Sequence, residues 1–289
     1  MLPAPPPRTP LTDGLGRRIS YLRISVTDRC DLRCRYCMAE KMQFLPKNQV
    51  LTLEEIALLA DLFIARGITR IRLTGGEPLV RRDSRDPARF AHVTRGGDIA
   101  KVLHGVTAAR DAGLAIKINM VALKGVNEDE ILPMLHWCDA EGLDLTLIET
   151  MPLGDTGEDR TDHYLPLTQV AAAINAAHPL TPVPDRTGGP ARYHRVDGLG
   201  ARLGLITPLT QNFCADCNRI RMTCEGKIFM CLGHEDHVDF KAALRDGGLD
   251  AVEPLIDRAL RLKPARHDFR IGAGETGPAT RRHMSVTGG

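Results

Sequence analysis

Between residues 20 and 150, segments with a strand pattern alternate with segments of helical periodicity. We predict strands over 20–26, 69–73, 115–122 and 143–150, and helices over 53–66, 98–112 and 127–140. Thr52 is the expected N-cap of the first helix, and Gly113 ends the second. This order predicts an α/β fold with parallel strands, whose ligand sites lie at the carboxyl ends of the strands. Cys30, Gly75, Lys117 and Met151 lie at or near those ends.

The alternation stops after Met151. A helix is expected over 167–177, whereas 179–200 is rich in proline and glycine and reads as irregular. We therefore place a boundary near residue 160, between a βα region (16–160) and a smaller region (161–289). The proline-rich start lacks the apolar core of a secretion signal, so residues 1–15 are expected to form a disordered leader.

Composition excludes several classes of function. At 289 residues and 43% hydrophobic, the chain can bury a full core. A net charge of +2 does not indicate a nucleic-acid partner or an anionic membrane surface, and no apolar stretch reaches the length of a membrane-spanning helix. Eight cysteines without a secretion signal indicate a reducing, cytoplasmic compartment.

Three of those cysteines, Cys30, Cys34 and Cys37, form a C-x3-C-x2-C loop. Three thiolates can hold a [4Fe–4S] cluster with one iron left open for a substrate or cofactor. Structural zinc is the alternative, but it takes four ligands and the nearest downstream histidine is His92. Disulfides are disfavoured by the compartment and by the close spacing.

This loop, with Tyr36 before its last cysteine, resembles the signature of radical S-adenosylmethionine enzymes. The segment Ile71-Arg-Leu-Thr-Gly-Gly-Glu-Pro78 is similar to the motif that holds the methionine part of that cofactor. The resemblance implies a partial, incomplete TIM-like barrel with a C-terminal iron–sulfur extension. It also implies that Tyr36, Gly76 and Met151 line the S-adenosylmethionine site.

A second group, Cys214, Cys217 and Cys231, has the spacing C-x2-C-x13-C and again suggests an open cluster. Cys224 lies between its members. It is either a fourth ligand that closes the cluster or makes a zinc site, or a bystander in a turn before Gly226. We favour the bystander.

Asn218-Arg-Ile-Arg221 directly after Cys217 resembles the GTP 3′,8-cyclase family, which begins molybdenum-cofactor biosynthesis. Further similar motifs are Thr94-Arg-Gly-Gly97, Lys117-Ile-Asn-Met120, Gly125-Val-Asn127, Glu149-Thr-Met-Pro152 and the terminal Gly288-Gly289. The family converts GTP to (8S)-3′,8-cyclo-7,8-dihydroguanosine 5′-triphosphate by a radical removal of hydrogen from C3′. The implied GTP contacts are Arg23, Arg72, Lys117, Arg219, Ile220 and Arg221. The Gly288-Gly289 tail is expected to reach the active site, with Arg281 and Arg282 as docking charges.

The chain departs from this family after Asp83. About two βα units, with a Thr-x-Asn-Gly and a Ser-Leu-Asp motif, are missing near 83–84, and Ser84 resembles a remnant of the second. A barrel that loses neighbouring strands must re-pair its edges or leave them open. We therefore expect the cluster sites to be retained and catalysis to be weak or absent.

The same resemblance implies an electron donor such as flavodoxin or ferredoxin, transfer of the product to cyclic pyranopterin monophosphate synthase, and a homodimer. Two other functions stay open: a different two-cluster radical S-adenosylmethionine enzyme, and a non-catalytic protein that binds nucleotide or metal.

Overall fold

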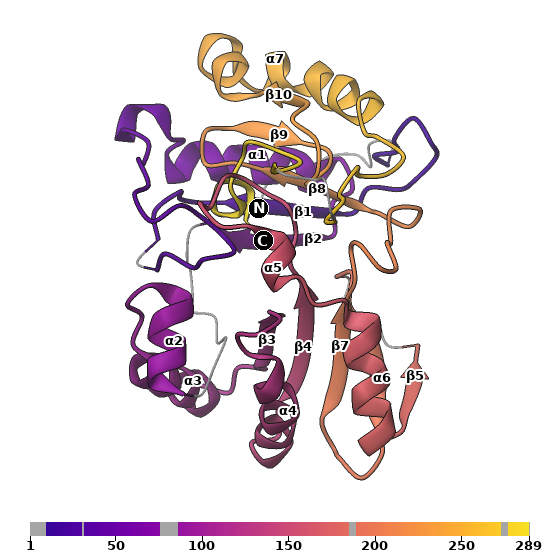
Figure 1. Cartoon of the computed structure of the whole chain (residues 1–289). Helices are drawn as coiled ribbons and strands as arrows, with labels where there is room; N and C mark the ends of the chain where they lie inside the picture. The colour runs from indigo at the N-terminus through magenta and orange to yellow at the C-terminus, as the bar shows by residue number, and fades with distance from the viewer. Residues whose placement is uncertain (1–9, 31, 76–85, 185–188, 273–276, 289) are drawn as a thin grey trace.

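The computed structural model describes residues 10–30, 32–75, 86–184, 189–272 and 277–288. Within them the chain forms two five-stranded sheets, which Figure 1 shows as an upper and a lower half. The upper sheet has the order β10-β9-β8-β1-β2 and the lower sheet the order β3-β4-β7-β6-β5.

The strands are β1 (Tyr21–Ser25), β2 (Arg70–Thr74), β3 (Lys117–Ala122), β4 (Asp144–Glu149), β5 (Leu180–Val183), β6 (Arg192–Val196), β7 (Arg202–Ile206), β8 (Arg219–Met222), β9 (Lys227–Phe229) and β10 (His237–Asp239). The helices are α1 (Leu53–Ala65), α2 (Pro87–Thr94), α3 (Ile99–Asp111), α4 (Ile131–Ala140), α5 (Arg160–His163), α6 (Leu167–Ala177), α7 (Lys241–Arg261) and α8 (Met284–Thr287), with 3₁₀ turns η1 (Lys47–Gln49) and η2 (Glu128–Glu130).

The predicted strands and helices of the first half are confirmed, with boundaries shifted by one or a few residues. Thr52 caps α1 in a full capping box with Glu55: the Glu55 N–H donates to the Thr52 hydroxyl, and the Glu55 carboxylate accepts from the Thr52 N–H. The segment predicted as one helix over 127–140 is a 3₁₀ turn followed by α4.

Both sheets have a parallel centre. β1 pairs in parallel with β2 on one side and β8 on the other, and β4 pairs in parallel with β3 and β7. The α/β prediction with parallel strands is therefore confirmed. The barrel is open, because within the described residues β2 and β3 are edge strands of different sheets. This break lies where we expected two βα units to be missing, and Leu73 on β2 is 60% exposed.

Strands after residue 160 complete both sheets. β7 extends the lower sheet beside β4, and β8 extends the upper sheet beside β1. Residues 179–200, expected to be irregular, form the antiparallel strands β5 and β6 on that lower sheet. The boundary near residue 160 thus marks a change from parallel to mixed topology and does not separate two sheets.

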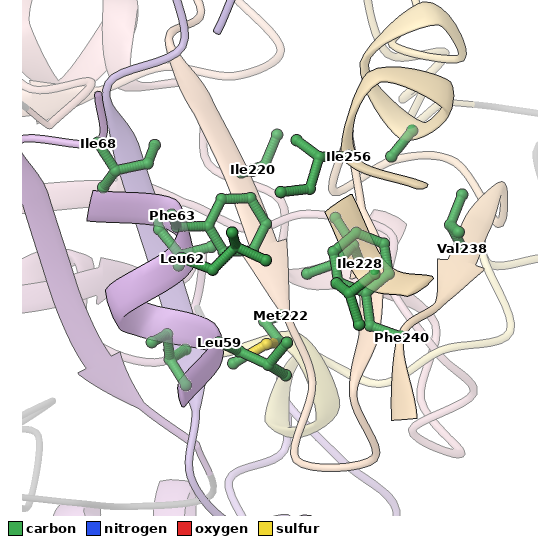
Figure 2. Packing of buried hydrophobic residues seen from close by; sticks show 14 of the residues in the cluster. Leu59, Leu62, Phe63, Ile68, Ile220, Met222, Ile228, Val238, Phe240 and Ile256 are labelled. Atoms are coloured by element: carbon green, nitrogen blue, oxygen red, sulfur yellow. The ribbon is translucent and has the colours of Figure 1, made fainter. Parts of the chain in front are cut away.

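Each half has its own apolar core. In the upper half, α1 and α7 cover the sheet, and Phe63 of α1 stacks on Phe240 with ring centroids 6.0 Å apart (Figure 2). In the lower half, α4 and α6 pack on β3, β4 and β7. Burial of these side chains is the main stabilising term in each half.

Part of the expected leader is ordered, which corrects that prediction. Leu11 is 1% exposed and packs in the upper core, and its carbonyl accepts a hydrogen bond from the Ile19 N–H at 2.8 Å. Residues 1–9 lie outside the described part of the chain. No helix among the described residues is both long and apolar enough to span a membrane.

Candidate active site

A pocket lies where the two halves meet. Its empty volume is about 1320 Å³, part of which is open to solvent. It is lined from the upper sheet by Arg23, Arg72, Arg219 and Arg221, and from the lower sheet by Lys117 and Asn119. Predicted site residues from the first and second halves of the sequence therefore share one cavity.

Three of the arginines form a row across the upper sheet. In the parallel register, Arg23 of β1 lies opposite Arg72 of β2 and opposite Arg221 of β8. Residues at one level of adjacent strands project on the same face, about 5 Å apart, and like charges so placed repel. We call Arg221, Arg23 and Arg72 the arginine row. Such a row is stable when an anion binds to it.

Arg219 adds a further positive charge next to the row. Burial, and then the charge of Arg219, lower the pKa of Arg221 to about 10. Arg219 is 9% exposed, with its guanidinium carbon 4.9 Å from the centroid of the Phe213 ring. The pocket therefore offers desolvated positive charge, which favours a ligand with several negative charges.

Lys117 faces these arginines from the lower sheet. Its ammonium donates to the Tyr193 hydroxyl at 2.8 Å, and Tyr193 is 1% exposed on β6. The ring fits because Gly204 stands beside it: a Cβ there would lie 3.0 Å from Tyr193 Cε1. Nothing in the local sequence predicted Tyr193, because 76 residues separate it from Lys117.

All three cysteines of the second group line the pocket. Burial raises the pKa of Cys217, but the charges of Lys263 and Arg219 outweigh it and bring the value down to about 7. Burial raises the pKa of Cys231. A thiol that ionises near neutral pH, beside two others on one wall, is a suitable donor set for an iron–sulfur cluster.

The first cysteine group lies next to this pocket. Cys34 and Cys37 pack with Tyr36 and Met151, and the latter two line the pocket. The loop is held by Arg95 of the Thr94-Arg-Gly-Gly97 motif, whose guanidinium donates to the Arg33 carbonyl at 3.2 Å and to the Met38 carbonyl at 3.1 Å. Arg95 is the C-cap of α2 and has a left-handed backbone conformation, with φ at 52°.

Among the described residues, no three cysteine, histidine, aspartate or glutamate side chains stand close enough to ligate one metal ion. Each cysteine of a [4Fe–4S] cluster binds a different iron, so its sulfurs stand further apart than the ligands of a single ion. The donor chemistry of both groups fits a cluster.

Cys224 is placed apart from the second group. It is fully buried and does not line the pocket that holds Cys214, Cys217 and Cys231. Burial, then the charges of Asp28 and Glu225, raise its pKa to about 12. A neutral thiol outside the pocket is a poor ligand, which favours the bystander interpretation.

The C-terminal tail reaches the arginine row. Arg221 donates to the Gly288 carbonyl at 2.8 Å. Gly288 has φ at 68°, and a Cβ there would lie 2.8 Å from Thr74 Cβ and closer still to the rest of that side chain. Arg282, expected to be a docking charge, is bound by Glu235 at 2.6 Å and anchors the tail.

Two other motifs have structural roles. The buried Glu149 carboxylate accepts from the N–H groups of Leu167, Leu209 and Thr210, at 3.1, 2.9 and 3.2 Å, and from the Thr210 hydroxyl. Asn127 closes the turn after β3 by accepting from the Leu123 N–H at 2.8 Å. Glu149 lines the pocket, whereas Asn127 stabilises the turn after β3 outside the pocket lining.

The contact of Ile220 with GTP stays a prediction for its backbone only. The Ile220 side chain is 1% exposed in the upper core and does not line the pocket, because it alternates with Arg219 and Arg221 on β8. Gly76 and Gly289 lie outside the described residues.

Comparisons with known proteins agree with this geometry. A family model for the radical SAM superfamily matches residues 24–93, and one described as Molybdenum Cofactor Synthesis C matches residues 143–269. The crystal structure of Streptococcus suis SuiB bound to S-adenosylmethionine has a similar fold, with a TM-score of 0.52 at 13% identity, over 82% of this chain and 67% of that chain. The fold and the matches define a radical SAM protein.

Curated relatives narrow the assignment. The GTP 3′,8-cyclase of Rhizobium meliloti is 48% identical over 97% of this chain and 95% of its own. That of Erythrobacter litoralis is 50% identical over 96% and 98%, respectively. The chain belongs to the GTP 3′,8-cyclase family. The alignment with the Rhizobium protein spans 330 positions, more than the 289 residues here, so the relative has segments that this chain lacks.

Proposed function

We propose that this protein binds GTP and S-adenosylmethionine and joins C3′ to C8 of GTP, as the name of its relatives describes, more slowly than they do. The observation that carries the proposal is the arginine row beside three pocket cysteines. It supports a ligand with a polyanionic end and a second end that meets a metal cluster.

The triphosphate of GTP has about four negative charges near neutral pH. The arginine row and Lys117 bind it through charge-assisted hydrogen bonds, each of which contributes about 1.5–3 kcal/mol. Ligand binding then offsets the repulsion within the row. Arg219, over the Phe213 ring and beside Cys217, directs the guanine toward the second cysteine group.

In this proposal Cys214, Cys217 and Cys231 hold one [4Fe–4S] cluster, and Cys30, Cys34 and Cys37 hold another. Tyr36, Gly76 and Met151 line the S-adenosylmethionine site. Held by these residues, the first cluster and S-adenosylmethionine would supply the radical chemistry needed for removal of the C3′ hydrogen, once a reductant provides an electron.

The residues of this chain orient the substrate and exclude water. Tyr36, Met151, Phe269 and Met284 form apolar walls around the polar groups of the pocket. Tyr193 fixes the Lys117 ammonium, so the charge that binds the phosphates does not need to reorganise on binding. The Gly288 carbonyl orients Arg221 in the same way.

The reduced rate follows from the open barrel. Within the described residues no strand joins β2 to β3, so Arg72, which lines the pocket, is on an exposed edge strand. Water and solvent exchange compete with a radical in an incompletely closed site. We further propose the cellular partners of the family: a flavodoxin or ferredoxin as reductant, cyclic pyranopterin monophosphate synthase as the next enzyme, and a second copy of the chain.

The test is an anaerobic turnover assay with dithionite, GTP and S-adenosylmethionine, with the Rhizobium meliloti enzyme in parallel. We expect 5′-deoxyadenosine and cyclic product in equal amounts, more slowly than from that enzyme. Inserting its extra βα segment after Asp83 should raise the rate.

A second candidate, a non-catalytic nucleotide-binding protein, is favoured by the open edge. GTP binding without any cleavage of S-adenosylmethionine would establish it and would refute the proposed cyclisation. If the chain without the inserted segment turned over as fast as the Rhizobium meliloti enzyme, the proposed effect of the open edge would be refuted.

A further inference from the structure

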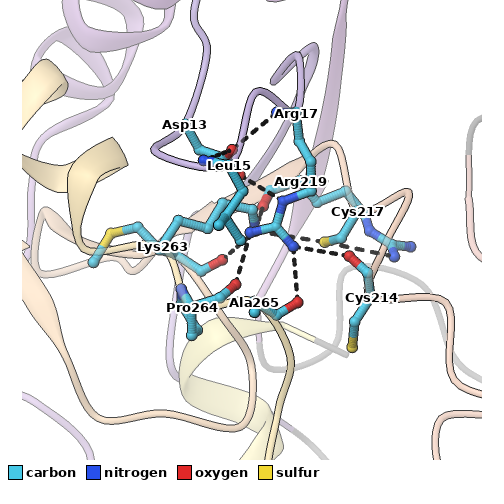
Figure 3. A network of polar contacts seen from close by, with 10 residues as sticks. Asp13, Leu15, Arg17, Cys214, Cys217, Arg219, Lys263, Pro264 and Ala265 are labelled. Atoms are coloured by element: carbon cyan, nitrogen blue, oxygen red, sulfur yellow. Dashed lines mark hydrogen bonds and ion pairs between the residues drawn. The ribbon is translucent and has the colours of Figure 1, made fainter.

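Lys263 is buried beneath the second cysteine group, two residues after α7. It is 6% exposed. Its ammonium lies 3.5 Å from Cys217 Sγ and donates to the carbonyls of Arg219 at 2.9 Å and Met230 at 2.6 Å (Figure 3). Met230 directly precedes Cys231, so one ammonium contacts both chain segments that provide cysteines.

The ion pairs found among the described residues give Lys263 no carboxylate partner. A buried ammonium without a counter-charge is costly. The anionic group that its position offers is the Cys217 thiolate, together with whatever that thiolate ligates. Figure 3 shows the Lys263 ammonium and the Cys217 sulfur pointing toward each other.

A second cation braces this arrangement from the N-terminal segment. Arg17 is fixed by Asp13, whose carboxylate it meets at 2.6 Å. Its guanidinium donates to the Cys214 carbonyl at 2.8 Å and to the Pro264 carbonyl at 2.7 Å (Figure 3). Arg17 therefore ties the first cysteine of the group to the residue that follows Lys263.

We infer that Lys263 is a positioning residue for the second cluster: it holds the Cys217 thiolate and the Cys231 segment in place and stabilises the negative charge of the bound cluster, while Arg17 fixes the Cys214 and Pro264 backbone around it. The inference rests on the second cluster of the proposed function. A three-thiolate [4Fe–4S] cluster is anionic and gains a further negative charge on reduction, so an adjacent ammonium favours the reduced form.

The experiment isolates the second cluster. In the full-length chain, Cys30, Cys34 and Cys37 are replaced by serine, and the protein is reconstituted anaerobically with iron and sulfide. Lys263→Met removes both charge and hydrogen bonds, and Lys263→Gln keeps a hydrogen-bond donor without the charge. Lys241→Met is the matched control, because Lys241 also donates to a backbone carbonyl, that of Gln49 at 2.7 Å, whereas the contact with a cysteine sulfur belongs to Lys263.

Two readouts are measured besides thermal melting of the apoprotein: the midpoint potential by EPR-monitored titration, and the rate of iron loss to a chelator. We expect both Lys263 variants to have a more negative potential than the control. We expect Lys263→Met to lose iron about 10- to 100-fold faster.

The outcomes separate the two proposals. If the parent with the intact Lys263 binds no cluster, the second cluster of the proposed function is refuted. If the parent binds a cluster but Lys263→Gln, folded by its melting curve, has the potential and iron-loss rate of Lys241→Met, the role of Lys263 is refuted.

Discussion

Replacing Arg72 by glutamine tests the arginine row, because it should weaken GTP binding and at the same time stabilise the ligand-free protein. Arg72 is exposed on the edge strand β2, so its removal costs little packing. Arg72→Gln removes one guanidinium charge from the row and keeps a side chain of similar polarity.

The magnitudes follow from the register. In the proposed function Arg72 binds phosphate of GTP, so loss of a charge-assisted hydrogen bond of about 1.5–3 kcal/mol should weaken binding about 10- to 150-fold. Without ligand, Arg72 lies opposite Arg23 across parallel strands. Like charges so placed cost roughly 0.2–1 kcal/mol, so the apoprotein should gain about that much stability.

The assay is calorimetric titration of GTP at two salt concentrations, paired with urea unfolding of the apoprotein. Arg70→Gln is the matched control: Arg70 lies two residues earlier on β2, projects on the same face and does not line the pocket. Equal effects of the two substitutions on GTP affinity, or a destabilised Arg72→Gln apoprotein with unchanged affinity, would refute the reasoning.

Three further predictions concern the tail and the cysteines. Gly288→Ala should release the C-terminus, because a positive φ costs an alanine about 1–2 kcal/mol and Thr74 occupies the space of the added Cβ. Protease cleavage at the C-terminus should therefore be faster than in the control Gly277→Ala, where an added Cβ has no atom within 4 Å. The pKa of Cys217 is lowered from 9.0 to about 7, so wild-type apoprotein should gain urea stability over Cys217→Ser as pH rises from 7 to 9 and lose that gain below 7; a constant difference across this range would contradict the assignment. Cys224→Ser should keep the iron content of the wild type, whereas Cys231→Ser should lose one cluster, as measured by iron and sulfide analysis; iron loss on Cys224→Ser would make it a ligand.

Local patterns predicted the first half of the fold well. The N-cap at Thr52 and the helical periodicity of α1 are properties of short segments, and both predictions are confirmed. The strands over 180–196 were not predicted, because their proline and glycine content indicates loops unless the lower sheet is known to supply partners. Leu11 was placed in a leader for the same reason: its burial depends on a core built from distant residues.

For the site too, residues in short motifs were predicted and residues that depend on distant contacts were not. Cysteine spacing indicated the two groups, and the Asn218-Arg-Ile-Arg221 motif indicated Arg219 and Arg221, which line the pocket. The row that joins Arg72 to Arg23 depends on strand register, which no short motif encodes. Lys263 and Arg17 were missed because they reach the cysteines across 46 and 197 residues of sequence, with no spacing pattern between them.

The central claim is that each cysteine group holds a [4Fe–4S] cluster with one open iron, one for S-adenosylmethionine and one for GTP. Anaerobic reconstitution followed by iron and sulfide counting and EPR of the reduced protein tests it most directly. The account predicts about eight irons per chain and two cluster signals, one altered only by S-adenosylmethionine and the other only by GTP. Bound zinc, or a single cluster insensitive to both molecules, would contradict it.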